Sequence, residues 1–525
     1  MLALNEKGLQ NRGEWESKGY ILPAYDRAAM IENTRKAPAW IHFGAGNIFR
    51  AFQCNAMQRL LNAGESDTGI IAVEGFDYEI VEKGYRPNDN YTLLVTLKAD
   101  GSVEKTVIGS IAESCILDGE NAAEYGRLKE IFTNPSLQMA SFTITEKGYV
   151  LTPAVEADFA NGPGKAKSYI GKVASLLYAR YRAGGAPIAM VSMDNCSHNG
   201  DKLRAAITAF AEGWQDDGFL AYVNSGKVSF PWTMIDKITP RPDDSVEKML
   251  RQDGLMGLAP IVTARHTYIA PFVNAEESEY LVIEDDFPNG RPALEKVGFI
   301  FTDRETVNKV ERMKVCTCLN PLHTALAVTG CLLGYTRISD EMKDADLVAL
   351  IRWVGYAEGL PVVTDPGVIQ PREFIDTVVN VRLPNPCMPD TPQRIACDTS
   401  QKIPIRFGET IKCYMADPAR DAASLQAIPL VIAAWLRYLL GVDDRGAAME
   451  VSPDPLLPQL REALADIQLG DPSGAEGKLD ALVSRADLFG VSLADAGLDG
   501  KVKAFFAEML AGPGAVRETL HKYLG

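Results

Sequence analysis

Residues 39–61, AWIHFGAGNIFRAFQCNAMQRLL, constrain the fold more strongly than any other stretch of the sequence. Trp40–Phe43 is a short apolar run typical of a buried strand, and Gly44–Gly46 predicts a tight turn. From Ile48 onward the apolar residues recur at helical spacing. In such a strand–turn–helix unit, backbone N–H groups and a helix N-terminus can approach a pyrophosphate. The stretch therefore predicts a dinucleotide-binding α/β domain.

An acidic residue supports this interpretation. Glu74 directly follows a second apolar run, residues 69–73, and lies 28 residues after Gly46. A carboxylate there can accept hydrogen bonds from a ribose and repel a 2′-phosphate, so we expect NAD rather than NADP. Phe49 replaces the third glycine of the usual G-x-G-x-x-G pattern. On this stretch alone, a glycine turn in another kind of α/β protein is the alternative.

The rest of the chain divides into two parts of different character. Helical patterns, notably Lys167–Arg182, alternate with further strand-like runs at residues 91–97, 139–145 and 187–193. Such alternation predicts a mostly parallel sheet. From about Asp286 the pattern becomes mainly helical, with Pro and Gly breaks. We expect an α/β protein with an N-terminal Rossmann-type domain, residues 1–285, and a mostly α-helical C-terminal domain, residues 286–525.

Charge and composition restrict the partners. The formal net charge of −16 argues against nucleic acid or an anionic membrane as the main partner. The most apolar runs, residues 324–335 and 427–436, are shorter than the roughly 20 residues that span a bilayer. The N-terminus lacks a signal-peptide pattern, and nine cysteines without regular spacing fit a reducing compartment. We expect a cytoplasmic protein that acts on a small molecule.

Residues 311–326, ERMKVCTCLNPLHTAL, place polar side chains inside an apolar, helix-like run. Lys314, Asn320 and His323 interrupt it, which suggests either a buried helix with incidental polar residues or a reactive site. Cys316 and Cys318 form a C-x-C pair, whereas zinc sites normally use C-x2–4-C with matching partners. We interpret both cysteines as core residues and expect no metal site.

Eight motifs taken together are far more specific. In chain order they are GAGNIFRAF, DNYTLLV, TITEKGY, SMDNCSHNG, DKITPRP, VIEDDFPNGRP, KVCTCLNPLHT and QRIACDTSQKIP. They resemble the polyol-specific long-chain dehydrogenases and reductases, the family of mannitol dehydrogenases and hexuronate reductases, from about residue 38 to about residue 410. The stretch PNPCMPDTPQRIACDTSQKIPIRFGETI is most similar to the fructuronate reductase branch.

The resemblance implies an NAD-dependent, metal-independent oxidoreductase with its substrate site between two domains. The expected reaction is D-fructuronate with NADH to D-mannonate with NAD. A mannitol/fructose polyol dehydrogenase and a tagaturonate reductase are the alternatives. A non-redox NAD-binding sensor or an epimerase is a further alternative. Many relatives are monomers, and we expect a monomer here.

The resemblance also assigns roles to individual residues. Lys314 matches the general acid/base, and apolar surroundings make a lysine a better base at neutral pH. Asn195 and Asn320 match the pair that steadies the reacting oxygen. His323 matches a residue that hydrogen-bonds a substrate hydroxyl. Glu311 matches a proton relay, with a plain i,i+3 ion pair to the lysine as the alternative.

Substrate and cofactor residues follow in the same way. Asp236 matches a supporting residue near the site, and Arg394 and Lys402 match the cations that hold the substrate. Those two cations do not choose between an acid and a neutral polyol, because a guanidinium binds carboxylates and hydroxyls alike. The expected cofactor-binding residues are Gly44, Gly46, Asn47, Phe49, Arg50 and Glu74.

One departure from the family pattern has a geometric consequence. The family spaces its lysine and asparagine as K-x4-N, whereas five residues separate Lys314 from Asn320 here. On a regular helix His323 would then lie about 180° from Lys314, instead of about 80° at the family spacing. A π-bulge would absorb the extra residue. Alternatively the helix restarts at Pro321, which would make Asn320 an N-cap. We expect a bulge or kink that preserves the catalytic face.

Overall fold

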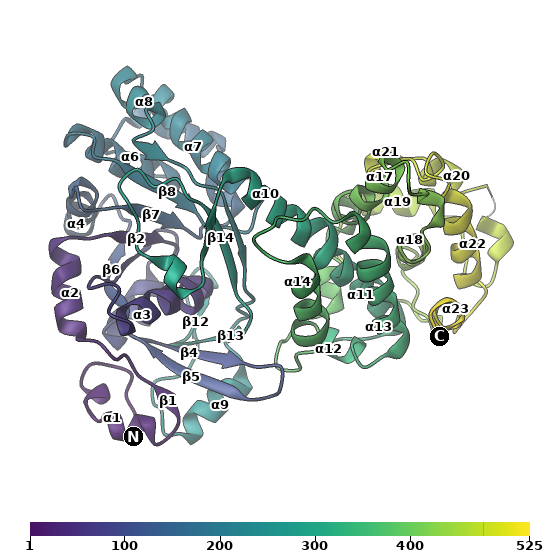
Figure 1. Cartoon of the computed structure of the whole chain (residues 1–525), viewed down its shortest axis with the longest axis horizontal. Helices are drawn as coiled ribbons and strands as arrows, with labels where there is room; N and C mark the ends of the chain where they lie inside the picture. The colour runs from purple at the N-terminus through teal and green to yellow at the C-terminus, as the bar shows by residue number, and fades with distance from the viewer. Residues whose placement is uncertain (476) are drawn as a thin grey trace. The chain divides into compact units, whose positions relative to one another are not determined.

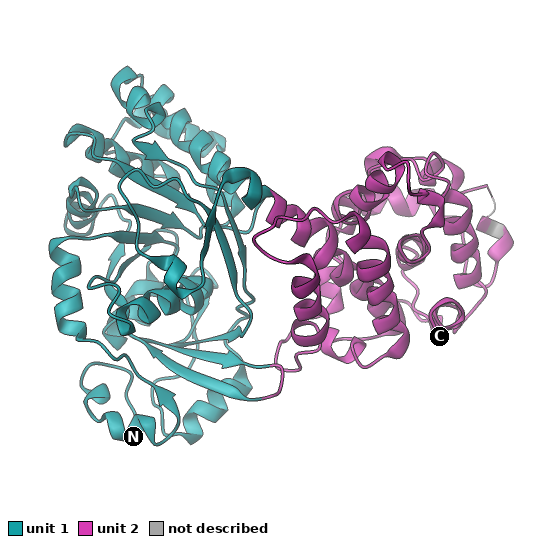
Figure 2. Ribbon diagram, viewed as in Figure 1, with its two compact units in different colours: residues 1–98, 102–308 teal, residues 99–101, 309–525 magenta. Residues whose placement is uncertain are grey.

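The computed structural model describes residues 1–475 and 477–525, and the chain forms two compact units. The first unit contains residues 1–98 and 102–308, and the second contains residues 99–101 and 309–525 (Figure 2). The boundary between the two compact units thus lies after Asn308, whereas the sequence analysis placed the domain boundary after residue 285. The intervening residues include strand β15 (Ile300–Thr302), which pairs in parallel with β14 (Tyr280–Glu284) of the first unit.

A six-stranded, fully parallel sheet forms the centre of the first unit (Figure 1). Its order is β6–β3–β2–β7–β8–β9, with bounds β2 (Trp40–Phe43), β3 (Ile70–Glu74), β6 (Ile111–Ile116), β7 (Met139–Phe142), β8 (Ile188–Ser192) and β9 (Val228–Ser229). This is the doubly wound order in which the direction of winding reverses between the first strand and its neighbour. The expected Rossmann-type parallel sheet is confirmed.

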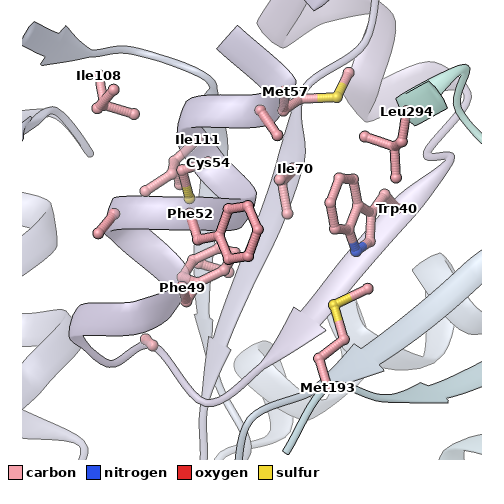
Figure 3. Close-up of a cluster of buried hydrophobic side chains, with 14 of the residues drawn as sticks. Trp40, Phe49, Phe52, Cys54, Met57, Ile70, Ile108, Ile111, Met193 and Leu294 are labelled. Atoms are coloured by element: carbon pink, nitrogen blue, oxygen red, sulfur yellow. The ribbon is translucent and has the colours of Figure 1, made fainter. Parts of the chain in front are cut away.

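Two apolar clusters cover the two faces of this sheet. One contains Trp40, Phe49, Phe52 and Leu294 (Figure 3), and the other contains Phe43 with helices of the opposite face. All four residues of β2 are buried, as expected for a central parallel strand covered on both sides.

Nine further strands among the described residues form smaller sheets. Their bounds are β1 (Tyr20–Ile21), β4 (Thr92–Leu97), β5 (Val103–Ile108), β10 (Thr233–Asp236), β11 (Ile261–Val262), β12 (Tyr268–Ile269), β13 (Phe272–Glu276), β14 and β15. The run 91–97 predicted a strand of the parallel sheet, but β4 belongs to the separate sheet β1–β5–β4–β13 and pairs antiparallel with β5. The short connection of residues 98–102 explains this, because a parallel pair needs a crossover of a dozen or more residues.

The first unit also contains helices, several of which cover the parallel sheet. Their bounds are α1 (Arg12–Glu16), α2 (Arg27–Lys36), α3 (Cys54–Asn62), α4 (Ala122–Thr133), α5 (Pro153–Asn161), α6 (Tyr169–Arg182), α7 (Asn199–Gly213), α8 (Asp217–Asn224) and α9 (Asp244–Gln252). Two π-helical segments, η2 (Phe49–Gln53) and η3 (Ile80–Tyr85), also belong to this unit. Segment η2 continues directly into α3.

The second unit is almost entirely helical, as expected for the C-terminal part. Its helices are α10 (Arg304–Met313), which begins in the first unit, α11 (Asn320–Leu333), α12 (Ile338–Glu341), α13 (Ala345–Arg352), α14 (Pro371–Thr377), α15 (Pro392–Ile395), α16 (Thr399–Ile403), α17 (Glu409–Ala416), α18 (Ala427–Tyr438), α19 (Leu457–Ala463), α20 (Asp480–Val483), α21 (Ala486–Phe489), α22 (Asp499–Met509) and α23 (Ala515–Leu524). Its π-helical segments are η7 (Lys314–Cys318), η8 (Trp353–Gly359), η10 (Val378–Arg382) and η11 (Pro404–Gly408).

A single long helix, Arg304–Leu333, combines α10, η7 and α11. By length and composition it could cross a membrane, but 83% of its most apolar window is buried inside the protein. A core helix passes the same test, so the apolar character is explained by packing. Helix α11 packs against α18, all of whose residues are buried.

Arg180 of α6 holds the amino-terminal edge of the parallel sheet together. Its guanidinium is buried and donates five hydrogen bonds to backbone carbonyls, those of Phe132, Asn134, Leu137, Ala186 and Pro187, at 2.6–3.0 Å. These carbonyls lie at the end of α4 and in the loops that precede β7 and β8.

We predict that Arg180→Lys lowers the free energy of unfolding by about 3 kcal/mol, because one ammonium group leaves several buried carbonyls without a donor. Urea denaturation followed by tryptophan fluorescence measures the change. The matched control is Arg182→Lys, since Arg182 is exposed two residues later on the same helix. Equal stabilities of the two variants would contradict the assignment.

Candidate active site

The glycine turn after β2 has the geometry that the sequence predicts. Gly44 has a φ of +103°, and a Cβ there would lie 2.2 Å from the carbonyl oxygen of Thr143. Only glycine fits both conditions. A Cβ on Gly46, by contrast, would meet no atom within 4 Å, so this position faces open space. The backbone at Gly46 is therefore accessible to a ligand.

Glu74 at the end of β3 is buried, and its carboxylate holds this turn in place through hydrogen bonds. Its Oε2 accepts a hydrogen bond from the N–H of Ala45 at 3.1 Å, and its Oε1 accepts from the N–H groups of Gly75, Phe76 and Asp77 at 2.8–3.2 Å. Burial raises the pKa of Glu74, and these N–H donors oppose the rise. One acceptor position on Oε2 remains for a ribose hydroxyl.

A cavity of about 280 Å³ lies beside the turn and is lined by residues that include Gly46, Asn47, Arg50 and Tyr268. Arg50 is buried, and burial lowers its pKa. Its guanidinium donates to the Ala270 carbonyl at 2.7 Å and to Asn47 Oδ1 at 2.8 Å, while its Nε has no hydrogen-bond partner among the described residues. A cation in the wall of this cavity, beside exposed backbone, fits the pyrophosphate of a dinucleotide.

Phe49, another expected cofactor residue, has a different environment. Its side chain is fully buried in the apolar cluster of Figure 3, and its ring stacks on His42 with centroids 4.2 Å apart. Only its backbone remains available for the predicted cofactor contact.

Asp194 organises the loop that carries Asn195. Its carboxylate accepts hydrogen bonds from the N–H groups of Ile144 and Thr145, at 3.1 and 2.8 Å, and from the Tyr149 hydroxyl at 2.5 Å. Burial raises the pKa of Asp194, and these hydrogen bonds oppose the rise. The motifs TITEKGY and SMDNCSHNG are thereby joined. Asn195 follows at the carboxyl end of β8 and is exposed.

The strand that ends at Asp236 is attached to the same loop. The side-chain N–H₂ of Asn199 donates to the Asp194 carbonyl at 2.9 Å and to the Thr233 carbonyl at 3.0 Å. Thr233 begins β10, and the buried Asp236 ends it. The first unit thus brings the predicted residues Asn195 and Asp236 onto two segments that are hydrogen-bonded together.

In the second unit, the extra residue between Lys314 and Asn320 is absorbed by a π-helical segment. Helix η7 spans Lys314–Cys318, and the N–H of Leu319 donates to the carbonyl of Lys314 at 3.1 Å, a five-residue step. The predicted π-bulge is confirmed. Asn320 is the first residue of α11 rather than its N-cap, and its side chain forms no hydrogen bond with the described residues. Its carboxamide therefore stays available for a ligand.

Lys314 opens this segment and is only 3% exposed. Glu311, one turn earlier in α10, is partly exposed and forms no ion pair or side-chain hydrogen bond within the described part of the chain. The alternative of a plain Glu311–Lys314 ion pair is therefore not what the structure shows. The relay role of Glu311 stays a prediction.

His323 contacts an acidic residue that the sequence analysis did not identify. Its Nε2 lies 3.1 Å from Oδ2 of Asp390, and Arg394 donates to Oδ1 of the same carboxylate from Nε and Nη2 at 3.0 and 2.6 Å. Burial would raise the pKa of Asp390, but the contacts with His323 and Arg394 outweigh it and lower that pKa. The i,i+4 spacing of Asp390 and Arg394 was the available sequence signal.

Two further cations lie on α16 and η11. Lys402 donates to the carbonyls of Ile395, at 3.0 Å, and Cys397. Arg406, also not identified from the sequence, donates from Nη1 to the Asn320 carbonyl at 3.4 Å and to the Thr324 hydroxyl. The structure therefore joins Arg406 to Asn320 and joins His323 to Arg394 through Asp390.

The two cysteines of the C-x-C pair lie in this helix without a metal-site arrangement. Burial raises the pKa of the Cys316 thiol to about 11 and that of Cys318 to about 12. Among the described residues, no group of three or more His, Cys, Asp or Glu side chains could hold a metal ion.

Known proteins with both parts of this architecture are similar to the whole chain. Residues 38–296 match the mannitol dehydrogenase Rossmann domain, and residues 306–509 match the mannitol dehydrogenase C-terminal domain. The chain is 50% identical to D-mannonate oxidoreductase of Thermotoga maritima, over 100% of this chain and 99% of that protein. It is 28% identical to D-mannonate oxidoreductase of Escherichia coli, over 91% of this chain and 94% of that protein.

Among solved structures, the chain is similar to Pseudomonas fluorescens mannitol 2-dehydrogenase in its ternary complex with NAD and D-mannitol. The TM-score is 0.71, with 28% identity over 100% of this chain and 99% of that one. Together with the two matching domains and the doubly wound sheet, these similarities show that the chain is an oxidoreductase of the mannitol dehydrogenase family.

Proposed function

We propose that the protein interconverts D-fructuronate and D-mannonate with NAD(H). The observation that carries this proposal is the 50% identity to a D-mannonate oxidoreductase over the full length of both chains. The NAD complex of the similar mannitol 2-dehydrogenase supports the choice of cofactor. A neutral polyol such as mannitol, the ligand in that complex, is the competing substrate class.

The glycine turn and the cavity beside it would hold the cofactor. In the proposal, backbone N–H groups after Gly46 and the Arg50 guanidinium bind the pyrophosphate, Asn47 positions that guanidinium, and Glu74 accepts a ribose hydroxyl. When bound, NAD supplies the hydride acceptor for alcohol oxidation and NADH the donor for ketone reduction.

Proton transfer at the reacting oxygen is proposed for Lys314. Its ammonium form donates a proton to the oxygen of the ketone as that carbon is reduced, and its amine accepts the proton in the reverse direction. The carboxamides of Asn195 and Asn320 donate hydrogen bonds to the same oxygen and stabilise its developing charge. His323, held by Asp390, would bind a neighbouring hydroxyl.

The cellular compartment, the partners and the oligomeric state of the enzyme are also proposals. All nine cysteines are free thiols, which is consistent with a reducing cytoplasm. The net charge of −16 disfavours nucleic acid and anionic membranes as partners. We propose a cytoplasmic monomer that acts on a small sugar acid.

We predict that Lys314→Ala lowers the turnover of D-fructuronate with NADH by at least about 100-fold, the scale of general acid–base catalysis. Absorbance at 340 nm measures the rate. Lys412→Ala is the matched control, because Lys412 pairs with Glu409 on the solvent-facing side of α17. Turnover that survives in Lys314→Ala would place the acid elsewhere, and a higher kcat/KM with mannitol and NAD than with D-mannonate would favour a polyol dehydrogenase.

We predict at least about a tenfold preference for NAD over NADP in kcat/KM, since the Glu74 carboxylate repels a 2′-phosphate. Glu74→Gln keeps the shape of the side chain and removes its charge, so the preference should narrow. Parallel assays with both cofactors test this. The exposed Glu82, changed to Gln, is the control and should leave the ratio unaltered. An NADP preference in the parent enzyme would contradict the assigned role.

A further inference from the structure

Arg406 lies on the π-helical segment η11, four residues after Lys402. This segment packs against η7, which begins with Lys314, and against α11. The Thr410 hydroxyl, just beyond η11, donates to the Cys316 carbonyl at 3.5 Å. The Arg406 side chain reaches α11 itself, because its Nη1 donates to the Asn320 carbonyl at 3.4 Å. Arg406 is thus attached to the helix that carries the proposed catalytic residues.

The charge of Arg406 is not neutralised by the protein. No carboxylate of the described residues lies within ion-pair distance of its guanidinium, and burial lowers its pKa to about 10 with no acidic neighbour opposing that change. Withdrawing a guanidinium from water without supplying an anion is costly, since desolvation penalises the charged form. A missing anionic partner would account for such a group.

One edge of the guanidinium is available for that partner. Both hydrogen bonds of Arg406 within the described chain use Nη1, one to the Asn320 carbonyl and one to the Thr324 hydroxyl. The Nε–Nη2 edge has no acceptor there, and the side chain is only partly buried, so solutes can reach it. Two parallel N–H groups along one edge match the two oxygens of a carboxylate.

A second cation, Lys402, adds to the positive electrostatic potential beside Arg406. Burial lowers the pKa of Lys402, and the charge of Arg406 lowers it further, with Arg394 adding to the effect and Asp398 opposing it. Lys402 donates to backbone carbonyls rather than to a carboxylate. Two repelling cations side by side become favourable when an anion binds between them.

Two arginines close to Arg406 in the second unit differ from it in this respect. Arg394 donates to Asp390 from Nε and Nη2, and Arg312 on α10 donates to Glu409 at 2.9 Å. Both of these guanidinium groups therefore have an internal counter-ion.

We infer that Arg406, assisted by Lys402, binds the carboxylate of the sugar-acid substrate through its Nε–Nη2 edge and sets the preference for hexuronates over neutral polyols. The inference rests on the proposed function. The keto carbon and the carboxylate carbon of D-fructuronate are separated by three carbons, so the carboxylate needs a cation distinct from the proton donor. Arg406 reaches the backbone of Asn320, and the carboxamide of Asn320 is proposed to face the reacting oxygen.

The test compares Arg406→Gln with the parent enzyme on an acid and on its neutral counterpart. Reduction of D-fructuronate and of D-fructose with NADH is followed at 340 nm, and NADH binding is checked by fluorescence titration. We expect kcat/KM for D-fructuronate to fall by roughly 100-fold, mainly through KM, because a charge-assisted bidentate contact is lost. The kcat/KM for D-fructose should stay the same or rise. Arg406→Lys, which keeps the charge, should recover part of the loss.

A purely structural role for Arg406 makes different predictions. Thr324→Val removes the hydroxyl that Arg406 contacts but keeps the guanidinium, so under our inference it should retain the preference for D-fructuronate. Arg312→Gln is the matched arginine control and should retain parent activity. An equal loss on both substrates in Arg406→Gln, or a loss in Thr324→Val as large as in Arg406→Gln, would overturn the inference.

Failure of the proposed function gives a separate result. If the parent enzyme reduced D-fructose and not D-fructuronate, the substrate assignment and the inference would both fall. If Arg406→Gln did not fold, the comparison of Arg406→Lys with Thr324→Val would decide, because the inference requires the larger change in acid-to-neutral preference in Arg406→Lys.

Discussion

The site depends on one extra residue in the long helix Arg304–Leu333. Each residue of a regular α-helix turns the chain by about 100°, so a single insertion would rotate every later side chain onto another face. The π-helical segment Lys314–Cys318 absorbs that residue within a single turn. Downstream of it, His323 lies against Asp390, and the backbone of Asn320 accepts from Arg406. From Lys309 onward the helix belongs to the helical unit and packs against its other helices, so the rotation of its side chains about the axis sets which residues these neighbours contact.

Local features of the sequence predicted the parts of the fold that depend on local forces. Trp40–Phe43 forms the expected buried strand with the same bounds, and the positive φ of Gly44 occurs in the expected turn. The π-bulge was also predictable, because a helix whose two ends must keep their faces can accommodate one more residue in few ways. The resemblance to the mannitol dehydrogenases supplied the roles of individual residues, which no periodicity could have given.

Features that depend on distant partners were not predictable in this way. The run 91–97 has the composition of any buried strand, and only its pairing with β5 and β13 assigns it to a separate sheet. Asp390 lies in a loop-like stretch, and its importance is visible only when His323, 67 positions earlier in the chain, is placed beside it. In the sequence, Arg406 looks like any other arginine on a helix. Only the described structure shows that it has no acidic neighbour.

Glu74 links cofactor choice to the integrity of the fold. The carboxylate proposed to exclude a 2′-phosphate also holds the N–H of Ala45 in the glycine turn and three N–H groups of the following loop. A mutation that removed it to admit another cofactor would also loosen the loop that any dinucleotide needs. A change of cofactor preference would therefore leave this loop intact only if it kept Glu74 and added a cation near the ribose.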